Sequence, residues 1–274
     1  MPESNLKQRV LVTGAYGLIG NLVYARLAAQ PERYEPFAMA RQARPSARAT
    51  HPGFVHIPAE RLRLADLTDM AAVQRAVEGV DTVVHLAADP DGRSGWESIL
   101  NNNIIGTQHV FEAARLAGVK RIIYASSNMV VFGYFKDEPY RQLSSWPPRA
   151  GAPPVQYTPI HHTMPTRPTT YYACSKVFGE ALASMYASVH GISCICLRIG
   201  WVVAEDRPPH PSARTIWCSQ RDCVQMVERS IWAPEDLRFD IFFVQSNNDQ
   251  NFVDIQHARD VLGYEPQDRA EDYL

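Results

Sequence analysis

Residues 9–29 read RVLVTGAYGLIGNLVYARLAA and combine an apolar run, three glycines and a set of apolar residues at helical spacing. The run at 10–12 predicts a buried strand, and the spacing in 18–27 predicts a helix directly after it. Gly14, Gly17 and Gly20 lie where the strand turns into the helix. Glycine suits a backbone with positive φ, and it lets a diphosphate and the first helix turn approach closely. Because a helix N-terminus also offers unpaired N–H groups to phosphates, this stretch predicts a dinucleotide-binding turn.

The rest of the chain alternates between strand and helix patterns. Helices are predicted over 70–78, 96–117 and 171–190, and further strands over 34–40, 61–65, 82–88, 121–127 and 193–199. The segment 82–88, TVVHLAA, is almost entirely apolar, which is typical of a strand in a sheet covered on both faces. This order predicts an α/β fold, a Rossmann-type doubly wound parallel sheet with right-handed crossovers and a small C-terminal substrate-binding part.

Two proline-rich segments interrupt the alternation, at 137–170 and at 205–214. Proline lacks a backbone donor, so neither segment is expected to form regular helix or central strand. Both follow the carboxyl ends of strands, where open α/β sheets bind their ligands. They are either plain surface loops or a substrate lid, and we favour the lid because long loops in compact domains are mostly functional or disordered. We expect one domain over 1–274, with 1–200 mainly binding the dinucleotide and 134–170 and 201–274 on the substrate side.

Composition excludes several classes of protein. The 274 residues carry a net charge of −2 without a long basic block, which argues against nucleic acid as a partner. No apolar run is long enough to cross a bilayer, and the first residues lack the apolar core of a signal peptide, so we expect a cytoplasmic protein. The five cysteines are interpreted as small core residues in a reducing compartment. Cys194 and Cys196 share one strand face but have no second pair or histidine partner, so no metal site is predicted.

The chemistry is predicted to depend on Tyr172 and Lys176, which are four residues apart on a helix and therefore share a face. Tyrosine, with a reference pKa of about 10, is a poor base at neutral pH, and a neighbouring ammonium favours its phenolate. This spacing alone is common and mostly reflects two solvated side chains. Here it follows a strand that ends in Ser126, Ser127 and Asn128, whose hydroxyls can polarise a carbonyl. The combination is far more specific than either part.

On these motifs the chain resembles the extended short-chain dehydrogenases/reductases, also called the NAD-dependent epimerase/dehydratase superfamily. Within that family it looks most similar to uronate dehydrogenases. The resemblance covers nearly the whole chain and continues from LRIG at 197–200 to VLGYEP at 261–266. The other matching segments are VTGAYGLIG at 12–20, ADLTD at 65–69, VVHLAA at 83–88, NIIGTQHVFEAAR at 103–115, YASSN at 124–128 and YYACSK at 171–176.

The resemblance implies a role for particular residues. Tyr172 is the expected acid/base and Lys176 its partner, Ser127 polarises the carbonyl, with Ser126 as a second claimant, and Asn103 supports a proton relay. Substrate-binding roles fall to Ser127, Asn128, Tyr172 and Arg214, although Arg207 and Arg167 are also considered for a sugar carboxylate. Cofactor-binding roles fall to Gly14, Tyr16, Gly17, Leu18, Ile19, Gly20, Asp66, Leu67, Leu86, Ala87, Ala88, Asn103, Tyr172, Lys176 and Ile199. His85, in a strand, is interpreted as a core histidine.

The chain departs from the uronate dehydrogenase pattern at several points. Its 137–170 loop is longer, Trp201 stands where a small hydroxyl residue is expected, and no arginine clearly matches the one that binds a sugar carboxylate. Where relatives that bind NAD end their second strand in an Asp for the adenosine ribose, this chain has Arg41, with Arg44 and Arg48 close behind. A guanidinium favours a 2′-phosphate, so we expect NADP, with NAD as the alternative.

Three functions remain open. The first is an NAD(P)-dependent dehydrogenase that oxidises a sugar or uronic acid, and the second is a nucleotide-sugar epimerase or dehydratase that keeps its cofactor bound. Only about 75 residues follow Gly200, which leaves little protein to hold a UDP group. The third, a binding protein that has lost catalysis, has no need for Ser127, Tyr172 and Lys176 together. In this family the helices 96–117 and 171–190 imply a homodimer, unless insertions within the chain cover their apolar faces.

Overall fold

The structure is a computed structural model that describes residues 7–47, 49, 53–144 and 155–273. Arg48 and the four prolines at 147, 148, 153 and 154 therefore lie outside the described residues. Within the described part of the chain, no helix is both long and apolar enough to cross a membrane.

A single sheet of seven parallel strands forms the centre of the molecule, in the order β3-β2-β1-β4-β5-β6-β7. The chain order reverses between β1 and β4, and this switch point is where open α/β sheets bind ligands. The predicted doubly wound parallel sheet is confirmed. The strands are β1 Gln8–Thr13, β2 Tyr34–Ala40, β3 Leu62–Leu64, β4 Thr82–His85, β5 Arg121–Ser127, β6 Ser193–Ile199 and β7 Phe239–Val244.

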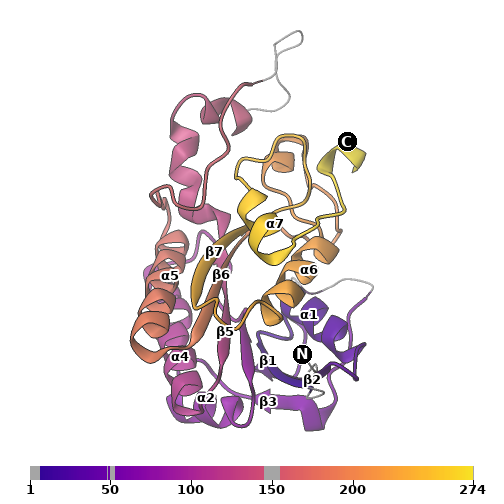
Figure 1. Ribbon diagram of the computed structural model, residues 1–274, viewed down its shortest axis with the longest axis vertical. Coiled ribbons are helices and arrows are strands. Elements are labelled where there is room, and N and C mark those ends of the chain that lie inside the picture. The colour runs from indigo at the N-terminus through magenta and orange to yellow at the C-terminus, as the bar shows by residue number, and fades with distance from the viewer. Residues whose placement is uncertain (1–6, 48, 50–52, 145–154, 274) are drawn as a thin grey trace.

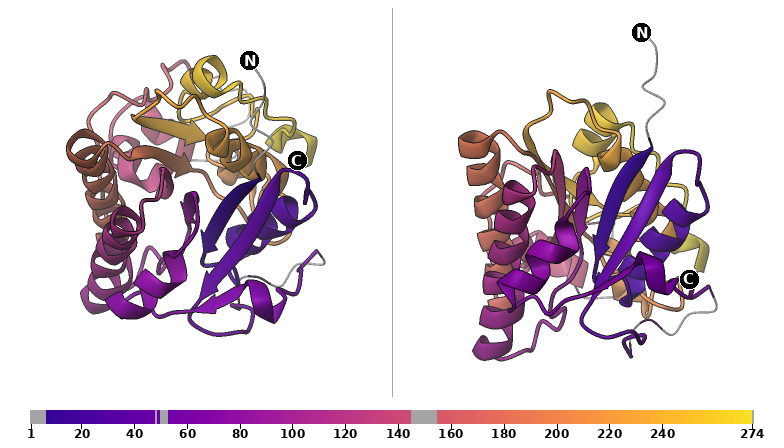
Figure 2. Two further views of the ribbon diagram at one scale, coloured as in Figure 1. Left: turned by 60° about the horizontal axis from the view of Figure 1, so that its bottom comes forward. Right: turned by 90° about the horizontal axis from the view of Figure 1, so that it is seen from below.

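Helices cover both faces of this sheet (Figures 1 and 2). On one face α1, α6 and α7 pack on a core that includes Val10 and Val12. On the other face α2, α4 and α5 pack on a second core that includes Leu11, because successive residues of a strand point to opposite faces. The α-helices are α1 Leu18–Ala28, α2 Met70–Val77, α3 Trp96–Ile99, α4 Gly106–Leu116, α5 Tyr171–His190, α6 Gln220–Ile231 and α7 Gln256–Leu262.

The structure differs from the sequence analysis in several elements. The strand predicted over 82–88 ends at His85, and the helix α7 was not predicted. The segment 96–117 is not one α-helix, because a π-helical stretch, Leu100–Ile105, separates α3 from α4. A seventh strand, β7, lies within the segment assigned to the substrate side, so residues after 200 also extend the sheet.

The short 3-10 helices are Ala59–Arg61, Asn128–Lys136, Tyr140–Ser144, Pro211–Thr215 and Ala270–Tyr273.

A third apolar core joins the proline-rich segment to the C-terminal part. Figure 1 shows these segments beyond the carboxyl ends of the strands. The rings of Phe135 and Phe252 stack there with centroids 3.9 Å apart, and Ile160 bridges to Val253. The backbone N–H of Arg167 also donates to the Val130 carbonyl at 2.7 Å. The described part of the proline-rich segment is therefore packed against the rest of the protein.

The five cysteines are all free. Cys194 and Cys196 lie in the same core, on one face of β6, as predicted. Cys218 and Cys223 are buried in the core on the other face. Cys174 is the exception to the prediction of core cysteines, because its side chain is exposed on α5.

Candidate functional site

The glycine turn after β1 brings the start of α1 against the strand ends. Gly14 has a φ of +69°, and a Cβ there would lie 2.9 Å from the backbone of Ala87. A Cβ on Gly20 would lie 2.1 Å from the Gly14 carbonyl oxygen, so only glycine lets the helix approach this closely. Gly17 is the N-cap of α1, and no side chain caps the helix. These features fit a dinucleotide diphosphate, which can accept from the N–H groups at this N-terminus.

A buried polar network fixes the strand end beside this turn. The Thr13 hydroxyl accepts from the N–H groups of Leu86 and Ala87, both at 3.1 Å, so its own proton points to Nδ1 of His85 at 2.9 Å. Nε2 of His85 lies 3.2 Å from the Thr107 hydroxyl. Burial first, and the charge of Lys176 second, lower the pKa of His85 to about 3. His85 is therefore a neutral core histidine, as the sequence analysis interprets it.

Arg41 and Asp66 lie at the far side of the switch point, after the ends of β2 and β3. Arg41 is exposed and directly follows β2, which ends at Ala40. The backbone N–H and hydroxyl of Thr68 donate to Asp66, and together with Arg41 they lower the pKa of that carboxyl. Leu67 is buried beside Asp66. This is the sheet edge at which relatives of this fold hold an adenosine.

Lys176 connects α5 to the end of β5. Its Nζ donates to the Ala125 carbonyl at 2.7 Å and lies 5.5 Å from the ring centre of Tyr172. Burial lowers the pKa of Lys176 to about 8, so the amine remains mostly protonated at neutral pH. An ammonium has three donors, and the contact with Ala125 uses one of them. Tyr172, half-buried, comes one helical turn earlier on the same face.

Two adjacent serines end β5, and their hydroxyls make different contacts. The Ser126 hydroxyl donates to Oε1 of Glu180 at 2.6 Å, so its proton is already used. The Ser127 hydroxyl accepts from the Met129 N–H at 3.2 Å, which leaves its own proton available to a ligand. Ser127 therefore remains the better candidate for polarising a carbonyl, and this role stays a prediction.

The sequence analysis assigned no role to Glu180, in the predicted helix 171–190, or to Arg198, in the quoted segment LRIG. Arg198 donates from Nε and Nη2 to the two carboxylate oxygens of Glu180, both at 2.8 Å, and their side chains are only 3% and 6% exposed. Since Glu180 also accepts from Ser126, this ion pair ties α5 and β6 to the strand end that carries Ser127. A charged residue inside the apolar strand pattern SCICLRI was the available signal.

Asn103 and Asn128 use their amides differently. Asn103, in the π-helical stretch, accepts from the Asp89 N–H at 2.7 Å and donates to the Asp89 carbonyl and to the Ser175 hydroxyl. Its amide therefore fixes the loop after β4, and a role in a proton relay stays a prediction. Asn128 is 1% exposed, and neither of its amide atoms has a hydrogen-bond partner among the described residues. Because unpaired buried amides are costly, this side chain is suited to a polar ligand.

The three arginines considered for a substrate carboxylate lie in three different segments of the chain. Arg214 is half-buried in the 3-10 helix Pro211–Thr215 and donates to the Gln250 side chain at 2.5 Å, and burial lowers its pKa. Arg167 forms an ion pair with Asp137, and Arg207 is exposed. The substrate role of Arg214 stays a prediction.

Known proteins resemble this chain over nearly its whole length. The NAD-dependent glucose-6-phosphate dehydrogenase of Haloferax volcanii is 34% identical over 275 residues, which cover 98% of this chain and 96% of that protein. The uronate dehydrogenase of Pseudomonas putida is 35% identical over 265 residues, 97% of this chain and 86% of that protein. A mutant uronate dehydrogenase from Agrobacterium tumefaciens, in a crystal structure with NAD, is 30% identical with a TM-score of 0.78, covering 98% and 88% of the two chains.

The family model described as the NAD dependent epimerase/dehydratase family matches residues 10–245. That range runs from β1 to the end of β7 and includes the glycine turn, both β5 serines and the tyrosine–lysine pair. The chain thus belongs to the NAD dependent epimerase/dehydratase family, within the extended short-chain dehydrogenases/reductases.

Proposed function

We propose that this protein is an NAD(P)-dependent dehydrogenase that oxidises a hydroxyl of a sugar or uronic acid and reduces the carbonyl in the reverse direction. The single observation that carries the proposal is the placement of Lys176, which contacts the end of β5 that carries Ser127 and lies 5.5 Å from the ring centre of Tyr172. Relatives that cover nearly the whole chain carry names of sugar and uronate dehydrogenases, which supports this substrate class.

The proposed chemistry divides the work among three side chains. The phenolate oxygen of Tyr172 takes the proton of the substrate hydroxyl, and the buried ammonium of Lys176 stabilises that phenolate. The Ser127 hydroxyl donates to the same substrate oxygen as it becomes a carbonyl. The nicotinamide, when bound, supplies the acceptor for the hydride. Gly14, Gly17 and the first N–H groups of α1 would hold its diphosphate.

The substrate is proposed to lie beside Asn128, which directly follows Ser127. Both amide atoms of Asn128 are buried and lack partners within the described residues, so a sugar hydroxyl there would remove a desolvation cost. We also propose that the proline-rich segment and the part after Gly200 enclose this side of the site, because both pack on the 3-10 helix that begins at Asn128. Trp201, which is 41% exposed, would narrow the space for the substrate on this side of the site.

A panel assay tests the function. The protein is incubated with NAD or NADP and with aldoses, uronic acids, sugar phosphates and UDP-sugars, and absorbance of the reduced nicotinamide is followed together with product analysis. Net reduction of the cofactor with a free sugar, uronic acid or sugar phosphate is the expected result. Conversion of a UDP-sugar without net reduction would instead identify an epimerase or dehydratase, and binding without conversion would identify a non-catalytic protein.

For the choice of cofactor, we propose that Arg41 gives a preference for NADP. The segment 41–47 contains no carboxylate to bind the ribose hydroxyls, and a guanidinium makes charge-assisted bonds to a 2′-phosphate. The names of the relatives mention NAD, so both cofactors are compared by kcat/KM. In Arg41→Asp, the ratio of kcat/KM for NADP to kcat/KM for NAD should fall by roughly tenfold or more, so that NAD is preferred. The preference for NADP should persist in Arg44→Ala, which removes a neighbouring arginine that donates to the Gln42 side chain. A wild-type preference for NAD that is unchanged in Arg41→Ala would refute this.

We further propose a homodimer formed by the outer faces of α4 and α5, together with α3. The apolar side chains exposed on these helices are Trp96, Leu116, Tyr171, Met185 and Val189. Trp96 and Tyr171 also pack edge to face, which makes them one continuous surface. Light scattering at micromolar concentration should give twice the chain mass of 30.8 kDa, and a monomer mass would contradict the proposal.

A further inference from the structure

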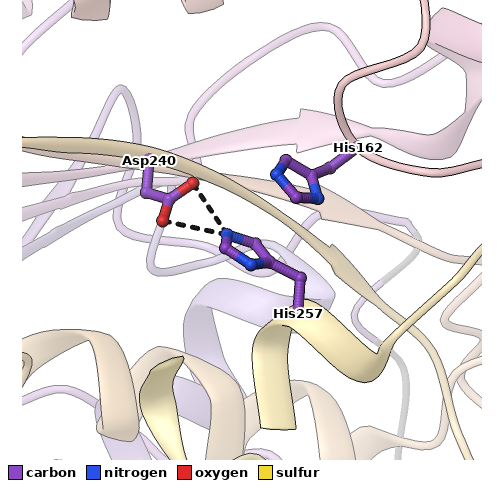
Figure 3. A group of neighbouring side chains, drawn as sticks. All are labelled: His162, Asp240 and His257. Atoms are coloured by element: carbon purple, nitrogen blue, oxygen red, sulfur yellow. Dashed lines mark hydrogen bonds and ion pairs between the residues drawn. The ribbon is translucent and has the colours of Figure 1, made fainter. Parts of the chain in front are cut away.

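Three polar side chains from distant parts of the sequence converge at the edge strand of the sheet (Figure 3). His162 comes from the segment before α5, Asp240 from β7 and His257 from α7. Their ligand atoms all lie within 4.8 Å of one another. Nε2 of His257 lies 3.0 and 2.9 Å from the two carboxylate oxygens of Asp240. The rings of His162 and His257 stack with centroids 3.8 Å apart.

We propose that His162, Asp240 and His257 bind one divalent transition-metal ion, with Zn²⁺ as the best match. Two imidazoles and one carboxylate form a ligand set that suits zinc, and a water would complete a tetrahedral site. Donors at zinc distances are roughly 3.4 Å apart, so the group must contract slightly to hold the ion. Nδ1 of His162 has no hydrogen-bond partner among the described residues, so no hydrogen bond at this atom opposes a rotation of the His162 ring toward the ion.

Burial and charge at this place are compatible with a cation. The side chains of His257 and Asp240 are 23% and 20% exposed, so an ion can enter from solvent. Arg198 donates to the His162 carbonyl at 3.2 Å. Its charge is offset by Glu180, which it contacts through two bonds.

An ion here would join three elements that approach the substrate side. The segment that carries His162 pairs with the 3-10 helix Asn128–Lys136 through the backbone of Arg167. Fixing His162 to β7 and α7 would therefore hold this segment against the strand ends. The site uses none of the side chains to which catalysis is assigned, so the two proposals fail independently.

The test uses the full chain, without an affinity tag, in a Cys174→Ser background that removes the exposed thiol. The protein is treated with a chelator, dialysed, and titrated with Zn²⁺ by calorimetry and with Co²⁺ by visible absorption. We expect one ion per chain and the intense absorption of four-coordinate Co²⁺. His162→Asn, Asp240→Asn and His257→Asn should each weaken the affinity at least about tenfold.

His161→Asn is the matched control, since it removes a histidine next to the site whose Nδ1 contacts the Thr163 hydroxyl. It should bind the ion with wild-type affinity. The parent protein binding no ion at tens of micromolar would overturn the proposal whatever the variants do. Equal affinity in the parent and in folded His162→Asn and Asp240→Asn proteins would overturn it as well, because the ion would then be held elsewhere.

Discussion

Replacing Glu180 by glutamine should destabilise the protein strongly, because it leaves the guanidinium of Arg198 buried beside a neutral partner. The two side chains are 6% and 3% exposed, and Glu180 accepts three hydrogen bonds, two from Arg198 and one from Ser126. Breaking a buried ion pair by removing one charge costs about 3–5 kcal/mol. At about 2–4 °C per kcal/mol for a chain of this size, the melting temperature should fall by roughly 10 °C.

The assay is urea unfolding followed by tryptophan fluorescence, with calorimetry for the melting temperature. Glu35→Gln is the control, since its pair with Arg61 has a similar separation of 2.7 Å but side chains 38% and 36% exposed. An exposed pair contributes at most about 1 kcal/mol. A double variant, Glu180→Leu with Arg198→Met, should recover much of the loss, because no charge is then left buried. If Glu180→Gln cost less than about 1 kcal/mol, our account of how the end of β5 is held would be wrong.

Three further predictions follow from the site. In steady-state kinetics, Ser127→Ala should lower kcat by about 100-fold. In urea unfolding, Ser126→Ala should mainly lower the free energy of unfolding, by about 1–2 kcal/mol. The opposite pattern would show that Ser126 is the residue that polarises the carbonyl. Gly20→Ala should weaken cofactor binding measured by calorimetry, because its Cβ would lie 2.1 Å from the Gly14 carbonyl; unchanged affinity would show that the turn can move. The unfolded chain binds a proton at His85 near pH 6.5 and the folded chain only near pH 3, so the free energy of unfolding should fall as the pH drops between these values, by on the order of 5 kcal/mol in full. In acid unfolding, His85→Asn should flatten this dependence on pH, and equal slopes in the variant and the wild type would contradict the burial of a neutral ring.

Strong apolar periodicity explains why most of the fold was predictable. The strand 34–40 and the helix 171–190 were predicted with the bounds that the structure has. The helix is bordered by Thr170, whose side chain caps its first turn, and by Gly191, whose φ of +70° ends it. The π-helical stretch Leu100–Ile105 was not predictable, since one extra residue per turn leaves the apolar pattern almost intact. The strand β7 was missed although its IFFV run is typical of a buried strand.

The site was predictable only where its residues are close in sequence. Tyr172 and Lys176 share a helix face, so their spacing alone brings them together. The resemblance pointed to Ser127, with Ser126 as a second claimant, but no spacing in the sequence could show that the Ser126 hydroxyl donates to Glu180. His162, Asp240 and His257 are too far apart in the chain for any spacing to reveal them, and no metal site was expected from the sequence.

The most direct test of the account is the turnover of Tyr172→Phe, measured beside its affinity for the cofactor. The phenol is needed for proton transfer, so kcat for the best sugar substrate should fall at least about 100-fold. The dissociation constant of the nicotinamide cofactor should stay within about threefold of wild type, because the glycine turn and Lys176 are untouched. A variant that keeps more than about a tenth of the wild-type kcat with normal cofactor affinity would contradict acid–base catalysis by Tyr172.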